Sequence, residues 1–340
     1  MDDRLALTLV TGFLGSGKTT LIRRFVETEA GADTGIIVNE FGEAGVDHAL
    51  FVHAAEQIEL VDGGCLCCAR RADVAQAMYR LVQAARQGRR FRRAILETSG
   101  LADPAPIIAT LARDPWLKSN VRLASVVAVV DAVAGLANLD AQPEARQQVS
   151  IADTVVVTKG DMRGACSFQD LARALRGLSP DAPVLDAQDP AFDAEAVLGG
   201  RGSPDAPTRS LFRAAEVADH RADLASFTLE LQERIDWPAF TIWLSSLLHA
   251  HGDRILRVKG LLHTSSARTR LAIHGVQHVM HPPSHLPLDP GDQRSFLVFI
   301  TRGVDRVAVE RSLRRMLDWS QRFSSLPART AGSSPTEAGR

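Results

Sequence analysis

Near its N-terminus the chain reads Gly12-Phe13-Leu14-Gly15-Ser16-Gly17-Lys18-Thr19. These residues fill every position of the phosphate-loop pattern G-x-x-x-x-G-K-[ST]. An apolar run at residues 5–10 precedes the pattern, and apolar residues at helical spacing follow it over residues 20–26. A buried strand, a glycine-rich turn and a helix in this order are the context that the pattern requires, so the sequence predicts a loop that binds phosphate.

Each residue type in this loop has a chemical reason to be there. The glycines let the backbone curl so that its N–H groups face phosphate oxygens, and the start of the following helix adds partial positive charge. Lys18 is expected to reach the β- and γ-phosphates, while the Thr19 hydroxyl is expected to bind Mg²⁺. The predicted nucleotide-binding residues of the loop are Gly12, Gly15, Ser16, Gly17, Lys18, Thr19 and Thr20.

Composition and charge indicate an ordinary globular protein with neither a nucleic-acid nor a membrane partner. Hydrophobic residues make up 45% of the 340 residues, charged residues 23%, and the formal net charge is −1. A chain this close to neutral has no broad field to attract nucleic acid or a membrane surface. No apolar stretch approaches the roughly 20 residues that span a bilayer, and the first strand begins too early for a signal peptide. We therefore predict a cytoplasmic location.

The first half of the chain alternates strand-like and helical runs. Nearly continuous apolar strands in such an alternation predict an α/β fold with a doubly wound, mostly parallel sheet. The expected strands are residues 5–11, 35–38, 94–97, 124–130 and 153–158, and the expected helices are residues 18–29, 71–87, 104–112 and 168–177. Together with the phosphate loop they predict a P-loop NTPase domain over residues 1–185.

The second half follows a different pattern. Residues 186–210 are rich in Gly, Pro, Asp and Ala, which predicts a linker. Residues 211–322 are expected to form a smaller α+β domain with an antiparallel sheet, and the Ser-, Ala-, Thr- and Gly-rich tail 323–340 is expected to be disordered. The expected strands of this domain are residues 224–231, 255–263, 270–280 and 295–301, and its expected helices are residues 237–250 and 305–319.

A second motif, Ile95-Leu96-Glu97-Thr98-Ser99-Gly100, ends an apolar strand in an acid. We expect Glu97 to hold Mg²⁺, either directly or through water. We expect the Gly100 N–H to meet the γ-phosphate, so that the following loop responds to hydrolysis. The alternative is a strand that simply ends in a solvent-exposed glutamate.

A third motif, Thr158-Lys159-Gly160-Asp161, is a variant of the guanine signature Asn-Lys-x-Asp. The Asp161 carboxylate can accept hydrogen bonds from N1–H and the exocyclic amine of guanine, whereas adenine has no donor at N1. The stem of Lys159 would pack over the base. Thr158 departs from the usual Asn, and the alternative interpretation is a polar loop between a strand and a helix.

Three of the four cysteines fall within Gly64-Cys65-Leu66-Cys67-Cys68. Neighbours this close do not form a disulfide framework, and thiolates are suitable ligands for Zn²⁺ and other soft transition metals. A fourth ligand can come from the preceding segment, where the candidates are Glu40, Glu43, His48 and His53. The alternatives are structural cysteines in a packed loop and a redox pair formed by Cys65 and Cys68.

These motifs, taken in order, resemble one family. The remaining segments that carry the resemblance are Val38-Asn39-Glu40-Phe41-Gly42-Glu43, Leu101-Ala102-Asp103-Pro104, Arg257-Val258-Lys259-Gly260 and Ile273-His274-Gly275-Val276-Gln277. The set is similar to the CobW-like metallochaperone GTPases, relatives of the urease and hydrogenase maturation GTPases UreG and HypB. The resemblance covers residues 4–320, which is most of the chain.

The resemblance implies a GTPase that binds a transition metal, most often Zn²⁺ although cobalt is compatible, and hands it to a client metalloprotein. It implies GTP and Mg²⁺ as further ligands and leaves a homodimer open. Asn39–Glu43 would form the first switch, with Glu40 beside Mg²⁺, and Glu97–Asp103 would form the Walker-B acid and second switch. The implied catalytic residues are Lys18, Glu40 and Glu97, the metal ligands Cys65, Cys67 and Cys68, the Mg²⁺ ligands Thr19 and Glu97, and the further nucleotide-binding residues Gly100, Lys159 and Asp161.

Two other functions share parts of this pattern. A small-molecule kinase can use the same phosphate loop, but it has no need of the cysteine cluster. A nucleotide-sensing scaffold with a structural zinc would keep its metal whatever nucleotide is bound. No residue stands out as an arginine finger, so intrinsic turnover is expected to be slow.

Overall fold

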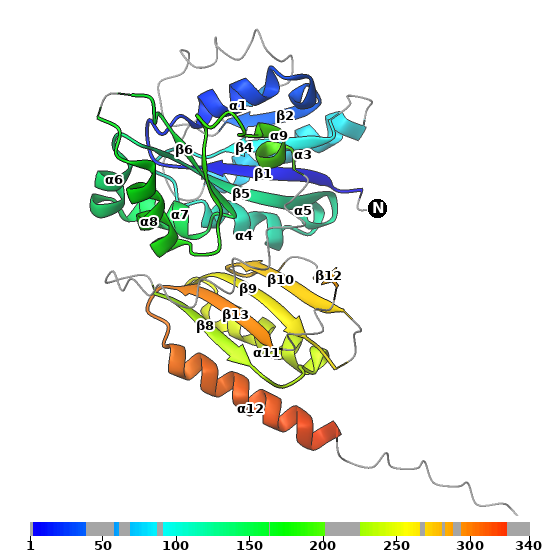
Figure 1. Ribbon diagram of the computed structural model, residues 1–340. Coiled ribbons are helices and arrows are strands. Elements are labelled where there is room, and N and C mark those ends of the chain that lie inside the picture. The colour runs from blue at the N-terminus through cyan, green and yellow to red at the C-terminus, as the bar shows by residue number, and fades with distance from the viewer. Residues whose placement is uncertain are drawn as a thin grey trace, which may run out of the picture.

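The computed structural model describes residues 3–38, 58–60, 69–86, 91–162, 164–200, 225–265, 269–280, 283–287 and 294–324. Its N-terminal half is built on a seven-stranded sheet, and its C-terminal half on a separate six-stranded sheet (Figure 1). This arrangement confirms the predicted fold class. Among the described residues, no helix combines the length and the apolar character that a bilayer crossing requires.

The N-terminal sheet has the strand order β3-β2-β4-β1-β5-β6-β7, and all neighbouring strands are parallel. Its strands are β1 (Leu5–Thr11), β2 (Thr34–Val38), β3 (Ile58–Leu60), β4 (Arg93–Glu97), β5 (Val121–Asp131), β6 (Thr154–Thr158) and β7 (Val184–Asp186). The central strand β1 is buried at every position because helices cover both faces of the sheet. Its alternate residues enter two different cores, Leu7 and Leu9 on one face and Val10 on the other.

The helices of this domain are α1 (Lys18–Val26), α3 (Ala69–Arg86), α4 (Ala105–Arg113), α5 (Pro115–Asn120), α6 (Gly135–Ala141), α7 (Pro143–Ser150), α8 (Phe168–Leu178) and α9 (Ala194–Leu198), with a short 3₁₀ turn η1 (Glu29–Gly31). Helices α3, α4 and α5 share the core of Leu7 and Leu9, whereas α1 and α9 share the core of Val10. Side chains of α6, α7 and α8 pack beside β5 and β6. The carboxyl ends of the parallel strands therefore all lie at the same end of the sheet, and the phosphate loop follows β1 at this end.

Part of the predicted linker has regular structure. Helix α9 begins after Asp193, whose carboxylate accepts a hydrogen bond from the Glu195 N–H at 2.8 Å. Val197 and Leu198 are buried in the core that α1 forms, and the Thr8 hydroxyl donates to the Leu198 carbonyl. The sequence around this short helix is rich in Gly and Pro, so its pattern does not predict a helix. We propose that the N-terminal domain extends to about residue 200.

The C-terminal sheet is antiparallel, with the order β11-β10-β9-β13-β8 and β12 beside β10. Its strands are β8 (Ala225–Leu231), β9 (Ile255–His263), β10 (Arg270–Val276), β11 (Val279–Met280), β12 (Ser284–Leu286) and β13 (Ser295–Thr301). The single strand expected over 270–280 is thus two strands joined by a turn in which Gln277 has a positive φ of 51°. The turn consists of only Gln277 and His278, and so short a polar pair does not separate two strands in the sequence pattern.

The two faces of the C-terminal sheet have different partners. Helices α11 (Trp237–His251) and α12 (Arg306–Ser324) share one core with it. On the other side Leu256, Val276 and Ile300 join the N-terminal core that includes Ile107 and Ile108 of α4. The C-terminal sheet therefore lies directly beside the N-terminal domain (Figure 1). Helix α12 continues past its predicted end to Ser324, and the rest of the predicted tail lies outside the described residues.

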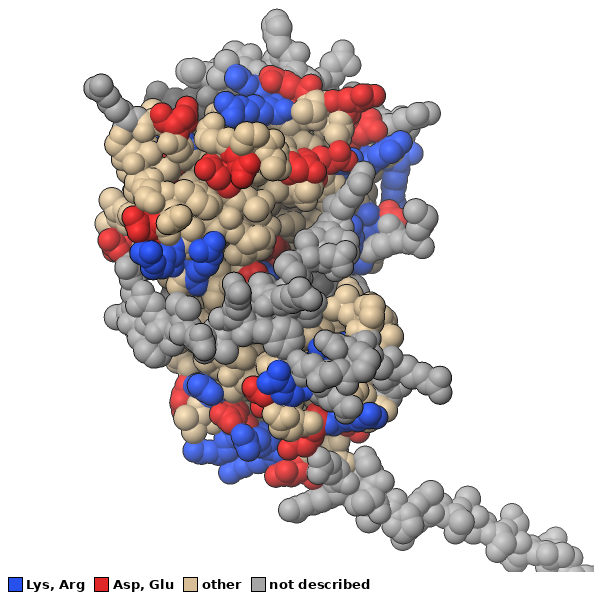
Figure 2. Space-filling model, viewed as in Figure 1, with Lys and Arg blue, Asp and Glu red and all other residues tan. Residues whose placement is uncertain are grey.

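Basic and acidic side chains lie interspersed on the face drawn in Figure 2. Neither sign covers a whole domain there, as the formal net charge of −1 leads one to expect. Specific polar contacts, rather than a broad field, are therefore the features to follow in this protein.

Candidate active site

The phosphate loop has the backbone that its glycines were expected to provide. Gly12, Gly15 and Gly17 have positive φ angles of 143°, 71° and 91°. A Cβ on Gly12 would lie 2.2 Å from the Val129 carbonyl oxygen, so no larger residue fits where β1 leaves the sheet beside β5. Gly17 immediately precedes α1, whose unpaired N–H groups thus open onto the loop.

Lys18 lies inside this loop rather than in solvent. Only 5% of it is exposed, and its Nζ donates to the carbonyl oxygens of Gly12 at 3.0 Å and Phe13 at 3.4 Å. The ammonium group is therefore placed at the mouth of the curl that the loop N–H groups form. A phosphate bound in that curl would meet a cation that is already in position.

Thr19 and Glu97 come together from different elements. The Thr19 hydroxyl at the start of α1 donates to Glu97 Oε1 at the end of β4, over 2.7 Å. Glu97 is 1% exposed, which excludes the alternative of a solvent-exposed strand end. Two hard oxygen donors side by side at a phosphate loop suit Mg²⁺, which prefers oxygen ligands and keeps part of its water shell.

The segment after Glu97 lies against the phosphate loop. The Thr98 hydroxyl donates to the Thr11 hydroxyl at 2.9 Å, which ties the end of β4 to the end of β1. A Cβ on Gly100 would lie 2.6 Å from the Leu14 nitrogen, so the two backbones are in direct contact and only glycine permits this approach. Gly100 therefore lies directly against the phosphate loop.

The Thr158–Asp161 segment contacts the other side of the phosphate loop. The Thr158 hydroxyl donates to the Ser16 carbonyl at 2.7 Å, so the residue that departs from the guanine signature still ties this loop to the phosphate loop. Lys159 has a positive φ of 59°, and its Nζ donates to the Gly15 carbonyl and lies 3.6 Å from Asp131 Oδ2. Asp161 is exposed and available to a ligand.

Sequence reasoning missed Asp131. This residue ends β5 and is 5% exposed, and its carboxylate accepts from the N–H groups of Val133 and Ala134 while facing Lys159. It thereby orients the turn into α6 and the lysine that is expected to cover the base. The sequence carries a signal for it, because the apolar run before Asp131 ends in an acid just as the run before Glu97 does.

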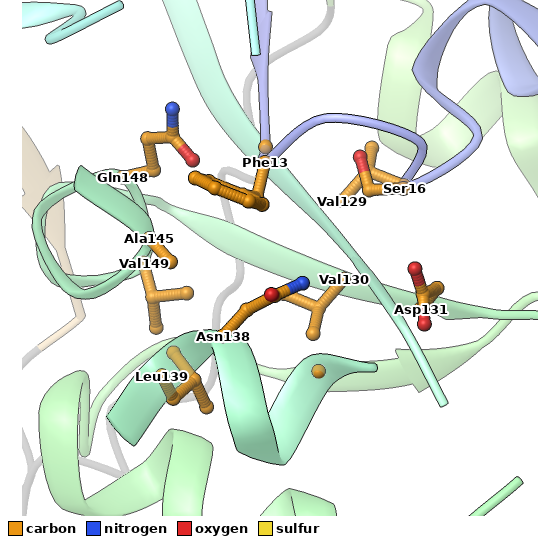
Figure 3. Close-up of a pocket in the computed structure, with 12 residues that line it drawn as sticks. Phe13, Ser16, Val129, Val130, Asp131, Asn138, Leu139, Ala145, Gln148 and Val149 are labelled. Carbon is orange, nitrogen blue, oxygen red and sulfur yellow. The ribbon is translucent and has the colours of Figure 1, made fainter. Parts of the chain in front are cut away.

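A small hollow, partly open to solvent, lies beside the phosphate loop (Figure 3). One wall is Phe13 of the loop, and the other is formed by side chains of α6 and α7. Its described lining is Gly12, Phe13, Ser16, Val129, Val130, Asp131, Gly135, Asn138, Leu139, Ala145, Gln148 and Val149. The lining is largely apolar.

Several predicted residues lie outside the described part of the chain. They are Asn39, Glu40 and Glu43 of the expected first switch, His48 and His53, and the cysteines Cys65, Cys67 and Cys68. Within the described ranges, no three His, Cys, Asp or Glu side chains are grouped as a metal site would need. The metal ligands remain predictions from the sequence.

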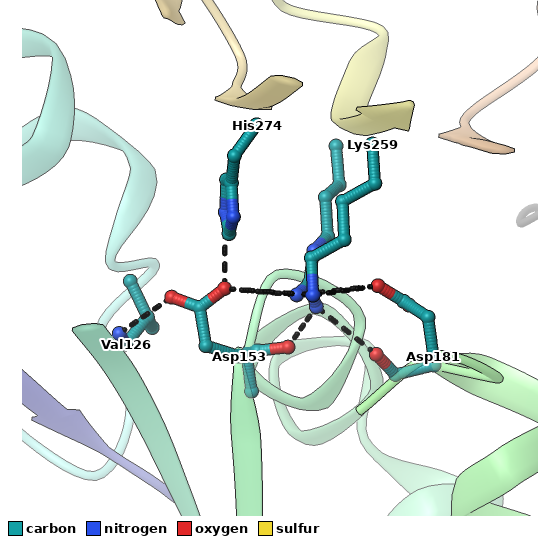
Figure 4. A network of polar contacts seen from close by, with 8 residues as sticks. Val126, Asp153, Asp181, Lys259 and His274 are labelled. Atoms are coloured by element: carbon teal, nitrogen blue, oxygen red, sulfur yellow. Dashed lines mark hydrogen bonds and ion pairs between the residues drawn. The ribbon is translucent and has the colours of Figure 1, made fainter. Parts of the chain in front are cut away.

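The segment Arg257–Gly260 of the C-terminal domain contacts the N-terminal domain through the side chains of Arg257 and Lys259 (Figure 4). Arg257 is 1% exposed, and its Nη2 lies 2.8 Å from Asp153 and 3.4 Å from Asp181 of the N-terminal domain. Lys259 Nζ lies 2.8 Å from Asp181, and His274 Nε2 lies 3.0 Å from Asp153. The buried Asp181 and the partly buried Asp153 thus face one guanidinium and one ammonium across the interface.

The pKa values of this cluster agree with that charge balance. Burial would raise the pKa of Asp181, but Arg257 and Lys259 lower it to about 2. Burial likewise opposes ionisation of Asp153, whose pKa the facing cations hold well below its usual range. Burial lowers the pKa of His274. Asp153 and Asp181 face Arg257 and Lys259, so these four charges balance.

Comparison with known proteins identifies the family. The sequence model of the CobW/HypB/UreG nucleotide-binding domain matches residues 6–186, and that of the cobalamin synthesis protein cobW C-terminal domain matches residues 224–317. This chain belongs to the CobW/HypB/UreG family. The assignment confirms the predicted resemblance, and it confirms GTPase as the class of enzyme.

Two relatives of this CobW/HypB/UreG protein match it over most of their lengths. The zinc chaperone YjiA of Escherichia coli strain K12 is 32% identical over 301 residues, which cover 87% of this chain and 93% of YjiA. The zinc chaperone CobW of a Sinorhizobium species is 30% identical over 311 residues, which cover 81% of this chain and 86% of that protein. The crystal structure of Zn(II)-bound YjiA GTPase from E. coli superposes with a TM-score of 0.67 at 27% identity, covering 92% of this chain and 99% of that one.

Proposed function

We propose that this CobW/HypB/UreG-family GTPase is a metallochaperone that binds Zn²⁺ through Cys65, Cys67 and Cys68 and passes it to a client metalloprotein in a nucleotide-dependent way. The observation that carries the proposal is the chain position of the cysteines relative to the phosphate site. Residues 61–68 join β3 to α3, and β3 runs parallel to β1 in the same sheet. The cysteine segment therefore begins at the sheet edge where the phosphate loop opens.

The distance between the two segments supports the same proposal. Strand β3 is three positions from β1 in the sheet, which is about 14 Å at the usual strand spacing. Only β2 and β4 separate them, and each of those strands ends at a segment with a proposed nucleotide contact, Asn39–Glu43 after β2 and Thr98–Asp103 after β4. A change in one of these segments can thus reach the cysteine segment without crossing the domain.

The proposed nucleotide site uses residues from three strand ends. Lys18 would neutralise the β- and γ-phosphates, Thr19 and Glu97 would hold Mg²⁺, and Lys159 with Asp161 would bind guanine. Mg²⁺ would supply charge stabilisation of the transferred phosphoryl group. The residues Gly12, Gly15, Ser16, Gly17 and Thr20 complete the phosphate cradle, and Glu40 is proposed as a further partner near Mg²⁺.

Nucleotide and metal are proposed to act through the same two switch segments, Asn39–Glu43 and Glu97–Asp103. Bound GTP would order the two switch segments, one of which contains Gly100, and would bring the cysteines into ligand geometry. Hydrolysis and phosphate release would loosen this order and favour transfer of Zn²⁺ to the client. The rival that stays open is a scaffold with a structural zinc, in which the metal would not respond to the nucleotide.

Replacing Cys65 and Cys67 together by serine tests the metal site. Each serine removes one thiolate ligand, so Zn²⁺ affinity should fall by more than the roughly 10- to 100-fold that loss of an outer-shell partner costs. The measurement is competition with a chromophoric chelator, together with calorimetry in buffers of different ionisation enthalpy to detect the protons that ligating thiols release. Affinity for GTP without metal should stay nearly unchanged.

Cys166 supplies the matched control, because it is the remaining cysteine of the sequence. It lies half-buried after β6, and the Cys166→Ser variant should bind Zn²⁺ like the wild type. Equal Zn²⁺ affinity of the double variant and the wild type would contradict the proposed site.

A further inference from the structure

Two neighbouring glutamines of α7 hold the loop that follows Glu97. Gln148 Nε2 donates to the carbonyl oxygens of Gly100 at 3.1 Å and Ala102 at 3.0 Å. Gln148 is 1% exposed, so this amide lies among protein groups and not in water. One side chain therefore fixes two peptide groups of residues 98–104, which we call the β4–α4 loop.

Gln147 holds the far end of the same loop. It hydrogen-bonds the Asp103 carboxylate, which also accepts from the Ala105 N–H at 2.9 Å where α4 begins. Its other amide atom, Oε1, accepts from Arg302 Nη2 at 2.6 Å. Burial raises the pKa of Asp103, and the hydrogen bonds from Ala105 and Gln147 together with the charge of Arg302 oppose that rise. The side-chain amide of Gln147 therefore connects Asp103 with Arg302.

Arg302 connects this arrangement to the C-terminal domain. It directly follows β13, so its position depends on the C-terminal sheet, while Gln147 and Asp103 belong to the N-terminal domain. The contact is separate from the Arg257 cluster, which meets the N-terminal domain at Asp153 and Asp181. The C-terminal domain therefore reaches the β4–α4 loop through one identifiable side chain.

The loop held in this way is part of the phosphate site. Gly100 lies between Gln148 on one side and the Leu14 backbone of the phosphate loop on the other. In Figure 3 Gln148 extends from α7 beside Phe13 of the phosphate loop. A displacement of about 1 Å in a group that positions a reacting phosphate can cost on the order of a hundredfold in rate.

We propose that Gln147 and Gln148 are positioning residues for GTP hydrolysis, and that Arg302 lets the C-terminal domain act on the phosphate site through them. The proposal rests on the GTPase part of the proposed function and not on metal binding. Gln148 keeps the Gly100 peptide in place against the phosphate loop. Gln147 hydrogen-bonds both Arg302 and Asp103, so a shift of Arg302 would move Asp103 at the other end of the same seven-residue loop.

The Gln148→Met variant tests the first step, because Met has a similar shape and lacks the amide donors. We expect kcat for GTP to fall about tenfold to a hundredfold. GDP has no γ-phosphate for Gly100 to contact, so GDP affinity should stay within about twofold. Gln232→Met, at an exposed glutamine of the C-terminal domain, is the control and should change neither quantity. A parallel loss of GDP affinity and hydrolysis would reveal a structural role and overturn the proposal, as would unchanged hydrolysis.

The second step is tested at Arg302, which is exposed and whose replacement leaves the core intact. We expect Arg302→Met and Gln147→Met each to lower kcat, and the double variant to lower it no further than the stronger single variant, because both remove one contact. Arg302→Lys should restore part of the rate, and Arg306→Met on α12 should leave it unchanged. Multiplying losses in the double variant, or a wild-type rate in Arg302→Met, would overturn the link between the domains.

The same measurements separate this proposal from the function on which it rests. A wild-type protein that releases no phosphate from GTP would contradict the GTPase function itself. A wild type that hydrolyses GTP, with Gln148→Met and Arg302→Met equal to it, would contradict only the positioning roles.

Discussion

Replacing Lys18 with alanine should lower the rate of GTP hydrolysis at least about a hundredfold, the usual cost of removing one preorganised group that stabilises transition-state charge. The physical reason is the position of its ammonium group, which is 5% exposed and hydrogen-bonded to the Gly12 and Phe13 carbonyl oxygens at the mouth of the phosphate loop. Alanine keeps the helix start intact because it is the best helix former. The measurement is release of inorganic phosphate at saturating GTP.

The lysines of this chain provide a convenient control. Besides Lys18, they are Lys118, Lys159 and Lys259, and only Lys118 lies exposed on α5 at the amino-terminal end of β5, away from the phosphate loop. Lys118→Ala should hydrolyse GTP like the wild type. Undiminished phosphate release by Lys18→Ala, with a normal circular dichroism spectrum, would count decisively against the assigned site.

Replacing Arg257 with methionine should lower the free energy of unfolding by about 3–5 kcal/mol, the usual cost of leaving a buried charge without its partner. Arg257 is 1% exposed and faces Asp153 and Asp181, so its loss leaves the buried Asp181 and the partly buried Asp153 with Lys259 as the remaining strong cation. Urea titration followed by fluorescence measures the change. Arg173 is the control, since its contact with Asp170 joins side chains that are 77% and 58% exposed. Arg173→Met should cost less than about 1 kcal/mol.

Acid should weaken the same interface in a defined direction. Because the pKa of Asp181 is lowered to about 2, the unfolded chain takes up protons first as the pH falls. The stabilisation is therefore complete above about pH 4 and is lost progressively as the pH falls toward about 2. In Arg257→Met the pH-dependent loss should be smaller and should end at a higher pH, because Asp181 keeps only Lys259 nearby and its folded-state pKa lies closer to that of the unfolded chain. An identical acid transition in variant and wild type would contradict the assigned cluster.

Local patterns in the sequence predicted most of the fold and the residue types of the phosphate site. The pattern Gly12–Thr19 and the apolar strand before it predict a phosphate loop. The seven-stranded sheet confirms the expected fold class, and the matching family model confirms the expected family. The proximity of Thr19 and Glu97 also followed, because parallel strands bring their carboxyl ends to one edge. The roles of these residues in binding and hydrolysis stay predictions.

Contacts between distant segments could not be predicted in this way. Gln148 reaches Gly100 across 48 positions of the chain, and Arg302 reaches Gln147 across 155 positions. A glutamine pair on an amphipathic helix has no signature of its own, and only the packing of α7 against the β4–α4 loop gives it a function. Likewise the segment Arg257–Gly260 carries part of the family resemblance, but the pairing of Arg257 with Asp153 and Asp181 depends on how the two domains pack.

The central claim is that nucleotide state sets the affinity for the metal. If the cysteine segment and the phosphate site share ordered segments, the two affinities are linked reciprocally, and Zn²⁺ should bind more tightly by roughly 1–3 kcal/mol with a non-hydrolysable GTP analogue than with GDP. The most direct measurement is a competition titration with a chromophoric chelator in each nucleotide state, with the Cys65→Ser/Cys67→Ser variant as the blank. The account predicts tighter binding in the GTP state, and equal Zn²⁺ affinity in both states would contradict it in favour of a static structural site.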